Sequence, residues 1–246
     1  MFDHNVLIHE FAHALGLADY YDVAYTGIDA VGHFDMQSAS QGDWNSYSKY
    51  AVGWINPVVV TDLKSGESVE IEIGAATQTG DAIVIPGAHS DYNGTPFDEY
   101  ILIDLFTSDG LNLYDAESYH MEDAVGVRIY HVDARMEKRE LTVEGKDGVY
   151  PIGTIHYANS YHEQGFYNIE LIQAGGDNTF TDTANLDTYL DADDLFVGGD
   201  SFTVESYAEF FLDGKMDDGT DFGYTVEIVK ITAGENPTAT IRITRQ

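Results

Sequence analysis

The chain has 246 residues, 43% of them hydrophobic, so it is long enough to bury the core of one large domain or two small ones. Its 43 acidic and 11 basic residues give a formal net charge of -32, which makes nucleic acid and anionic membranes poor partners. The sequence contains no cysteine, which excludes disulfides and thiolate metal sites, and no apolar run is long enough to span a membrane.

The first predicted element is a helix over residues 3–17, which ends near Gly16. Its apolar positions recur at helical spacing: Val6, Leu7, Phe11, Ala14 and Leu15. Residues 19–45 are rich in Gly, Asp, Ser and Tyr and are predicted to form an ordered loop. A second short helix is predicted from about residue 46 to residue 52, and Pro57 closes this part of the chain.

After Pro57 the pattern changes to short alternating segments separated by turns rich in Gly, Asp and Asn. The predicted strands cover residues 58–60, 69–73, 82–85, 100–106, 126–132, 168–173, 224–231 and 238–243. No helical period of useful length appears among them. The sequence therefore predicts an α+β chain, with a helical part at residues 1–57 and a mostly antiparallel, β-sandwich-like domain with its own core at residues 58–246.

The first helix carries the segment His9-Glu10-Phe11-Ala12-His13. Residues four apart lie on one face of a helix, so both imidazoles are able to bind one metal ion. Glu10 lies beside them, where it is able to take a proton from a metal-bound water whose pKa zinc lowers to about 7. This spacing is the signature of a zinc metallopeptidase, although a helix that carries two histidines for other reasons remains the alternative.

The residues after His13 favour the metal site. Gly16 allows a sharp turn because glycine adopts positive φ at little cost, and that turn is able to bring Asp19 back toward the metal. A carboxylate is an acceptable third zinc ligand and leaves a fourth position open for water. Asp19 as a turn cap or a calcium ligand is the other interpretation.

This pattern resembles the metzincins, with a candidate Met-turn at Gly32-His33-Phe34-Asp35-Met36. Within them the chain looks like the immune inhibitor A-like metallopeptidases (peptidase family M-six), which are secreted bacterial proteases. The similar segments are Asp19-Tyr20-Tyr21-Asp22, Phe34-Asp35-Met36, residues 47–55, residues 99–103, residues 126–135 and Asp194-Leu195-Phe196. The resemblance implies that His9, His13 and Asp19 are zinc ligands, that Glu10 is the general base and that Met36 lies in the turn below them.

The resemblance also implies a function, a zinc-dependent endopeptidase that is secreted and acts on a protein or peptide substrate. Residues 1–57 would be the C-terminal part of its catalytic domain, with the active-site helix, the Met-turn and the second helix. Only eight residues precede His9, so we expect a fragment of a longer protease, with an export signal upstream and weak or no activity alone. The alternative is a non-catalytic, β-rich extracellular binding module that keeps a remnant protease helix.

One departure from the family is Ala39, where members often carry Tyr, so Tyr47 or His33 would have to stabilise an oxyanion. Other candidates are weaker. His131 and Asp133 share one face of a predicted strand, but Arg128 and Asp133 in surface or interface ion pairs is the preferred interpretation. No pattern marks His156 or His162 as ligands. Two acidic groups are predicted to be solvated turns, with Ca²⁺ binding as the second option: Asp187, Asp191, Asp193 and Asp194, and Asp213, Asp217, Asp218 and Asp221.

Overall fold

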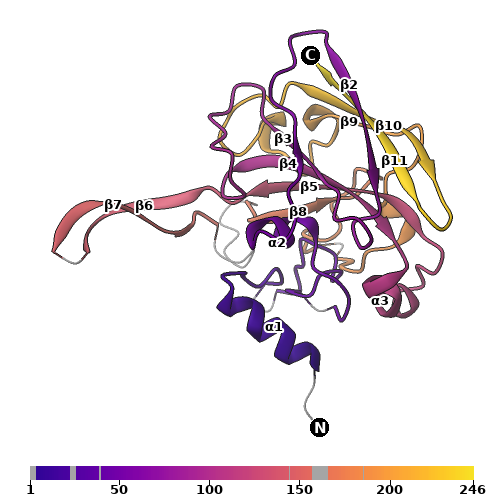
Figure 1. The fold of residues 1–246 in the computed structure, drawn as a ribbon, viewed down its shortest axis with the longest axis horizontal. Helices are drawn as coiled ribbons and strands as arrows, with labels where there is room; N and C mark the ends of the chain where they lie inside the picture. Colours follow the sequence, from indigo (N-terminus) through magenta and orange to yellow (C-terminus); the bar gives the residue numbers. More distant parts are fainter. Residues whose placement is uncertain (1–3, 23–25, 39, 144, 157–165, 185) are drawn as a thin grey trace.

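The computed structural model describes residues 4–22, 26–38, 40–143, 145–156, 166–184 and 186–246 (Figure 1). Its α-helices and strands are, in chain order, α1 (His4–Ala14), α2 (Ser46–Ala51), β1 (Val58–Val59), β2 (Ser68–Gly74), β3 (Ile83–Pro86), β4 (Glu99–Thr107), α3 (Leu113–Ser118), β5 (Val125–Asp133), β6 (Met136–Val143), β7 (Lys146–Thr154), β8 (Ile169–Ile172), β9 (Ser201–Phe202), β10 (Tyr224–Thr232) and β11 (Thr238–Arg245). Short 3-10 turns are η1 (Gly110–Asn112), η2 (Ala192–Asp194), η3 (Val204–Ser206) and η4 (Leu212–Gly214).

Most strands of the described residues belong to two sheets. The first sheet has the order β1-β3-β4-β5-β8, and the second has the order β2-β11-β10-β9. Neighbouring strands are antiparallel except β1 and β3, which are parallel. The prediction of a mixed α+β chain with mainly antiparallel sheets is thus confirmed, and each predicted strand matches an observed one to within two residues at either end.

The first sheet is the middle layer of the molecule. Successive side chains of a strand point to opposite faces, and in β4 one set packs against the second sheet while the other set packs against the N-terminal segment. Ile101, Ile103 and Leu105 belong to the first core, whereas Tyr100, Leu102 and Phe106 belong to the second. Both faces of the sheet are therefore covered, which explains why every residue of β4 is buried.

The second core joins residues on both sides of the predicted boundary at residue 57. Tyr20, Phe34 and Tyr47 pack there with side chains of β3, β4, β5 and β8. The N-terminal segment and the sheet thus share one hydrophobic cluster. The division of the chain into domains 1–57 and 58–246 stays a prediction. The helix α1 takes little part, because Ala12 is its one buried residue among those described.

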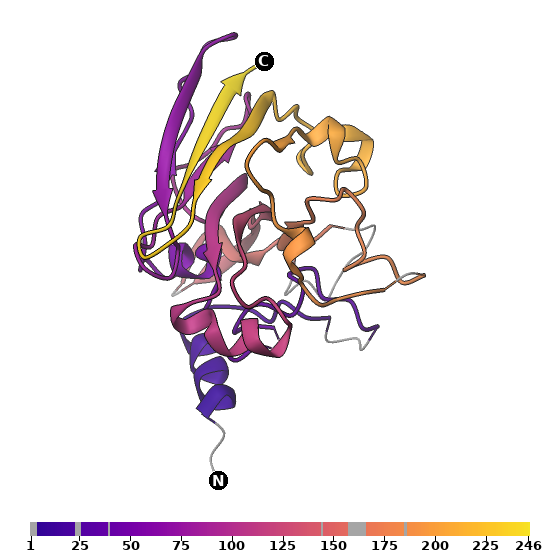
Figure 2. The same cartoon turned by 90° about the vertical axis from the view of Figure 1, so that its right-hand side faces the viewer.

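Two features stand apart from the layered body. The helix α1 lies at one end of the molecule, below the sheets in Figures 1 and 2, and the hairpin β6–β7 projects sideways in Figure 1. This hairpin is missing from the predicted strands, because its charged first strand lacks a regular apolar alternation. No helix of the described residues is long and apolar enough to cross a membrane.

Candidate metal centre

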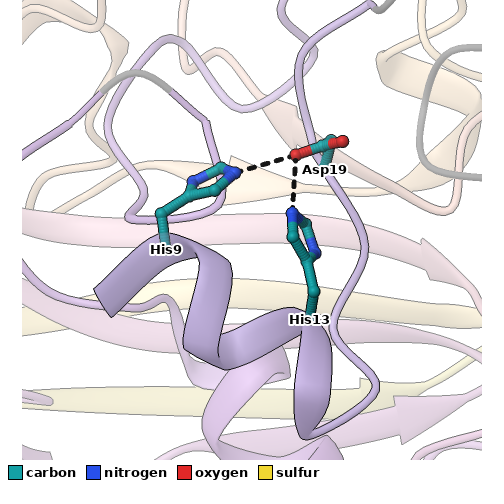
Figure 3. A group of neighbouring side chains, drawn as sticks. All are labelled: His9, His13 and Asp19. Carbon is teal, nitrogen blue, oxygen red and sulfur yellow. Dashed lines mark hydrogen bonds and ion pairs between the residues drawn. The ribbon is translucent and has the colours of Figure 1, made fainter. Parts of the chain in front are cut away.

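The two histidines of α1 converge on one oxygen atom of Asp19 (Figure 3). Nε2 of His9 lies 2.9 Å from Oδ1 of Asp19, and Nε2 of His13 lies 3.3 Å from the same atom. Ligands of a tetrahedral zinc ion lie about 2.0–2.2 Å from the metal and therefore roughly 3.2–3.6 Å from one another. The convergence expected from the sequence is thus observed, at separations close to those of a zinc site.

A turn after α1 brings Asp19 to the histidines. Gly16 has φ 97°, a conformation that favours glycine, and its N–H donates to the carbonyl of His13. Beyond the turn, the N–H of Tyr20 donates to the carbonyl of Gln37 at 2.8 Å. Asp19 is therefore held between the end of the helix and the loop that contains Met36.

Each histidine is anchored at its other ring nitrogen by a main-chain carbonyl. Nδ1 of His9 lies 2.7 Å from the carbonyl oxygen of Met36. Nδ1 of His13 lies 2.8 Å from the carbonyl oxygen of Leu17. A carbonyl only accepts hydrogen bonds, so each Nδ1 carries the hydrogen, and each Nε2 of a neutral ring offers a lone pair to the space beside Asp19.

The loop that carries Met36 is held by Asp35. The Asp35 carboxylate accepts the N–H of Gln37 at 2.7 Å and the N–H of Asn45 at 2.6 Å. The Met36 side chain is buried, with 4% of its surface exposed, and its carbonyl orients His9. The position predicted as a Met-turn therefore lies beside the candidate ligands.

An open groove runs along the His9 side of the centre. Glu10 is exposed and lines this groove together with Asn5, Val6, His9, Tyr21, Met36, Ser40 and Gln41. The Tyr21 ring stacks on the His9 ring at a centroid distance of 6.2 Å. Tyr21 belongs to the segment Asp19-Tyr20-Tyr21-Asp22, but no sequence pattern predicts a role for its side chain at this site.

The two residues considered for stabilising an oxyanion, Tyr47 and His33, differ in their surroundings. Tyr47 is buried, and burial raises its pKa to about 12; it lines a different cavity, beside Leu15 and Leu17. His33 lies 3.6 Å from Asp29 and packs on Tyr189. Ala39 lies outside the described residues.

The expectation that Arg128 and Asp133 form surface or interface ion pairs is wrong. Arg128 is buried and donates to Asp104 at 2.8 and 2.9 Å. Asp133 is also buried and accepts from Arg135 at 2.7 and 2.6 Å. The reason is that β4 and β5 are covered on both faces, which a single strand pattern does not reveal.

A second group of metal-binding residue types lies at the end of β4 and β5. Nε2 of His131 lies 3.0 Å from Oε1 of Glu99, and Nε2 of His156 lies 2.8 Å from Oδ2 of Asp133. Burial opposes protonation of His131, but Asp217 and Glu99 raise its pKa to about 9. Burial raises the pKa of the Asp217 carboxyl to about 6.

The acidic segments behave differently from one another. Asp191 and Asp194 cap the 3-10 turn η2: Asp191 accepts the N–H of Asp193, and Asp194 accepts the N–H of Asp191. In the second segment Asp217 is partly buried against His131, so the expectation of a solvated turn is wrong for this residue. His162 lies outside the described residues.

Comparison of the chain with models of protein families, with curated proteins and with solved structures finds no match. The resemblance to the immune inhibitor A-like metallopeptidases therefore rests on the quoted sequence segments. The convergence of His9, His13 and Asp19 is an observation independent of that resemblance.

Proposed function

We propose that this protein is a zinc-dependent endopeptidase, with His9, His13 and Asp19 as the metal ligands. The supporting observation is the arrangement of three acceptors around one point. Both Nε2 atoms lie beside Oδ1 of Asp19, and in neutral imidazoles whose Nδ1 atoms donate to the main-chain carbonyls they offer lone pairs to the same space. A bound cation satisfies all three at once, and the carbonyls on Nδ1 supply the orienting contacts typical of metal-binding histidines.

The donor set fits zinc and leaves room for substrate. Two imidazole nitrogens and one carboxylate oxygen are three protein ligands, and a catalytic zinc site keeps its fourth position open. When bound, zinc supplies Lewis-acid chemistry, since it lowers the pKa of a coordinated water to about 7 and polarises a carbonyl. Glu10 is not one of the three proposed ligands, and it lines the open groove. There its carboxylate would take the proton of the attacking water and pass it to the leaving amine.

We further propose that the chain acts within a longer, secreted protease, as the family resemblance implies. The supporting feature is the surface of α1, where Val6, Leu7 and Phe11 are 56%, 58% and 61% exposed. Large apolar side chains clustered on one helix mark a surface that another element covers. Such an element beside Glu10 would form the second wall of a substrate cleft and position the peptide.

The test measures casein hydrolysis by the full-length protein after its metal is removed with a chelator. We expect the stripped protein to be inactive and added Zn²⁺, but not Ca²⁺ alone, to restore hydrolysis. His13→Ala is expected to abolish the recovery, because it removes one of three ligands. Hydrolysis that survives chelation, or that His13→Ala retains, would show that this centre does not perform the reaction.

A further inference from the structure

The face of the first sheet that packs on the second sheet becomes polar at one end. Ile101 and Ile129 lie in the apolar core on this face. Farther along the same face lie Glu99, His131 and Asp133. All three are buried, with exposed fractions of 2%, 3% and 0%. Buried ionisable groups are costly unless they are paired or bind a metal ion, so this end of the sheet needs a specific explanation.

The segment that covers this polar end comes from far along the chain. Glu99 accepts the N–H groups of Asp217 and Asp218, across more than a hundred residues of sequence. The aromatic ring of Phe211 lies 4.9 Å from the His131 ring. The loop after η4 is therefore fixed to β4 by the Glu99 carboxylate, and Phe211, just before η4, packs on His131 of β5.

Two of the carboxylates have different electrostatic partners. Asp133 is neutralised by Arg135, which donates to both of its oxygens. Among the described residues no hydrogen bond to the Asp217 carboxylate is found, although it lies near Glu99, His131 and His156. The carboxylates of Glu99 and Asp217 are therefore surrounded by two imidazoles, His131 and His156, and by Arg135, whose guanidinium lies 3.6 Å from Glu99.

We propose that Glu99, His131 and Asp217 form a second metal site, which binds a divalent transition cation such as zinc. One ligand atom from each residue lies within 4.8 Å of the other two, and Nε2 of His131 is already 3.0 Å from Oε1 of Glu99. A cation would replace the hydrogen bond between His131 and Glu99 and would bind the Asp217 carboxylate directly. Imidazole together with carboxylates favours zinc or a similar ion over calcium, which prefers an all-oxygen shell.

The role of this site is structural. Its ligands come from β4, from β5 and from the loop after η4, so the bound ion would join the covering loop to the first sheet. Asp133 and His156 lie on the other side of Asp217 and form an overlapping group with it. We assign the ion to Glu99 rather than to Asp133, because Arg135 donates to both oxygens of Asp133 at 2.7 and 2.6 Å but approaches Glu99 only to 3.6 Å.

The test counts zinc bound per full-length chain, measured by atomic emission after dialysis against Zn²⁺ and removal of loosely held ions. We compare the native protein with His9→Ala/His13→Ala, which removes the first centre. The double variant is expected to keep one zinc ion per chain at the second site. Adding Asp217→Asn to it is expected to remove that ion, and with it the rise in melting temperature that zinc produces. The proposed peptidase centre and this site thus succeed or fail separately.

Asp218→Asn in the same background is the matched control, because Asp218 is an exposed neighbour that offers Glu99 only its N–H. It is expected to keep the ion. A folded double variant that binds no zinc, or an unchanged count after Asp217→Asn, would overturn the proposal. Should Asp217→Asn fail to fold, anomalous diffraction from zinc-soaked native crystals decides, since a peak between Glu99, His131 and Asp217 is required.

Discussion

Glu10→Gln is expected to lower the rate of peptide hydrolysis by roughly two to four orders of magnitude, the usual size of a general-base contribution. Glutamine keeps the shape and volume of the side chain but cannot accept the proton of the attacking water. Glu10 is exposed in the groove beside His9, and its carboxylate makes none of the contacts that join the three candidate ligands. Zinc affinity is therefore expected to stay close to that of the native protein.

The measurement pairs casein hydrolysis by the full-length protein with a zinc titration of the same preparation. Glu117→Gln is the matched control, because Glu117 is an exposed glutamate on α3. It should change neither quantity. Unchanged hydrolysis in Glu10→Gln would remove Glu10 from the mechanism, whereas loss of zinc together with activity would assign Glu10 to the metal shell.

Asp104→Asn is expected to lower the free energy of unfolding by about 3–5 kcal/mol, the cost of breaking a buried ion pair from one side. Asp104 is fully buried on β4 and accepts two hydrogen bonds from Arg128 of β5 and one from Ser46 of α2 at 2.6 Å. Removing its charge leaves the buried Arg128 guanidinium without the carboxylate that it hydrogen-bonds, beside the rings of Phe106 and Tyr130. Urea unfolding measures the effect.

Two comparisons make the stability result specific. Asp104→Leu combined with Arg128→Met removes both charges and is expected to recover most of the loss, since apolar residues of similar volume often replace a buried pair well. Glu70→Gln breaks the exposed pair with Arg242 and is expected to have little effect, because solvent screens it. A small loss in Asp104→Asn would mean that the buried interactions of Asp104 with Arg128 and Ser46 contribute little to stability.

The spacing of apolar and turn-forming residues along the sequence predicted the features of this fold that depend on residues close together in the chain. The helix that carries His9 and His13 follows from apolar residues at helical spacing, and the approach of Asp19 follows from the glycine turn three residues earlier. The strands follow from alternation between turn-forming residues. Each of these features is decided by backbone preferences over a short stretch of chain, which is the information that a single sequence contains.

Contacts between distant segments were beyond such reasoning. The register of β4 and β5 places Asp104 opposite Arg128, whereas the sequence pattern favoured a surface or interface ion pair for Arg128. The meeting of Glu99 with Asp217 depends on how the loop after η4 folds over the sheet. The shared core of Tyr20, Phe34 and Tyr47 with the sheet was likewise missed, because no periodicity in the N-terminal loop indicates which surface covers it.

The most direct test of the proposed function is the position of zinc in crystals of the protein, located by anomalous diffraction at the zinc absorption edge. We predict a peak about 2.0–2.2 Å from Nε2 of His9, Nε2 of His13 and Oδ1 of Asp19, with a fourth position open toward the groove. The carbonyls of Met36 and Leu17 should still accept the hydrogen bonds from Nδ1 of His9 and Nδ1 of His13. Crystals grown with zinc that show no peak among these three atoms would contradict the assignment of this centre as a catalytic zinc site.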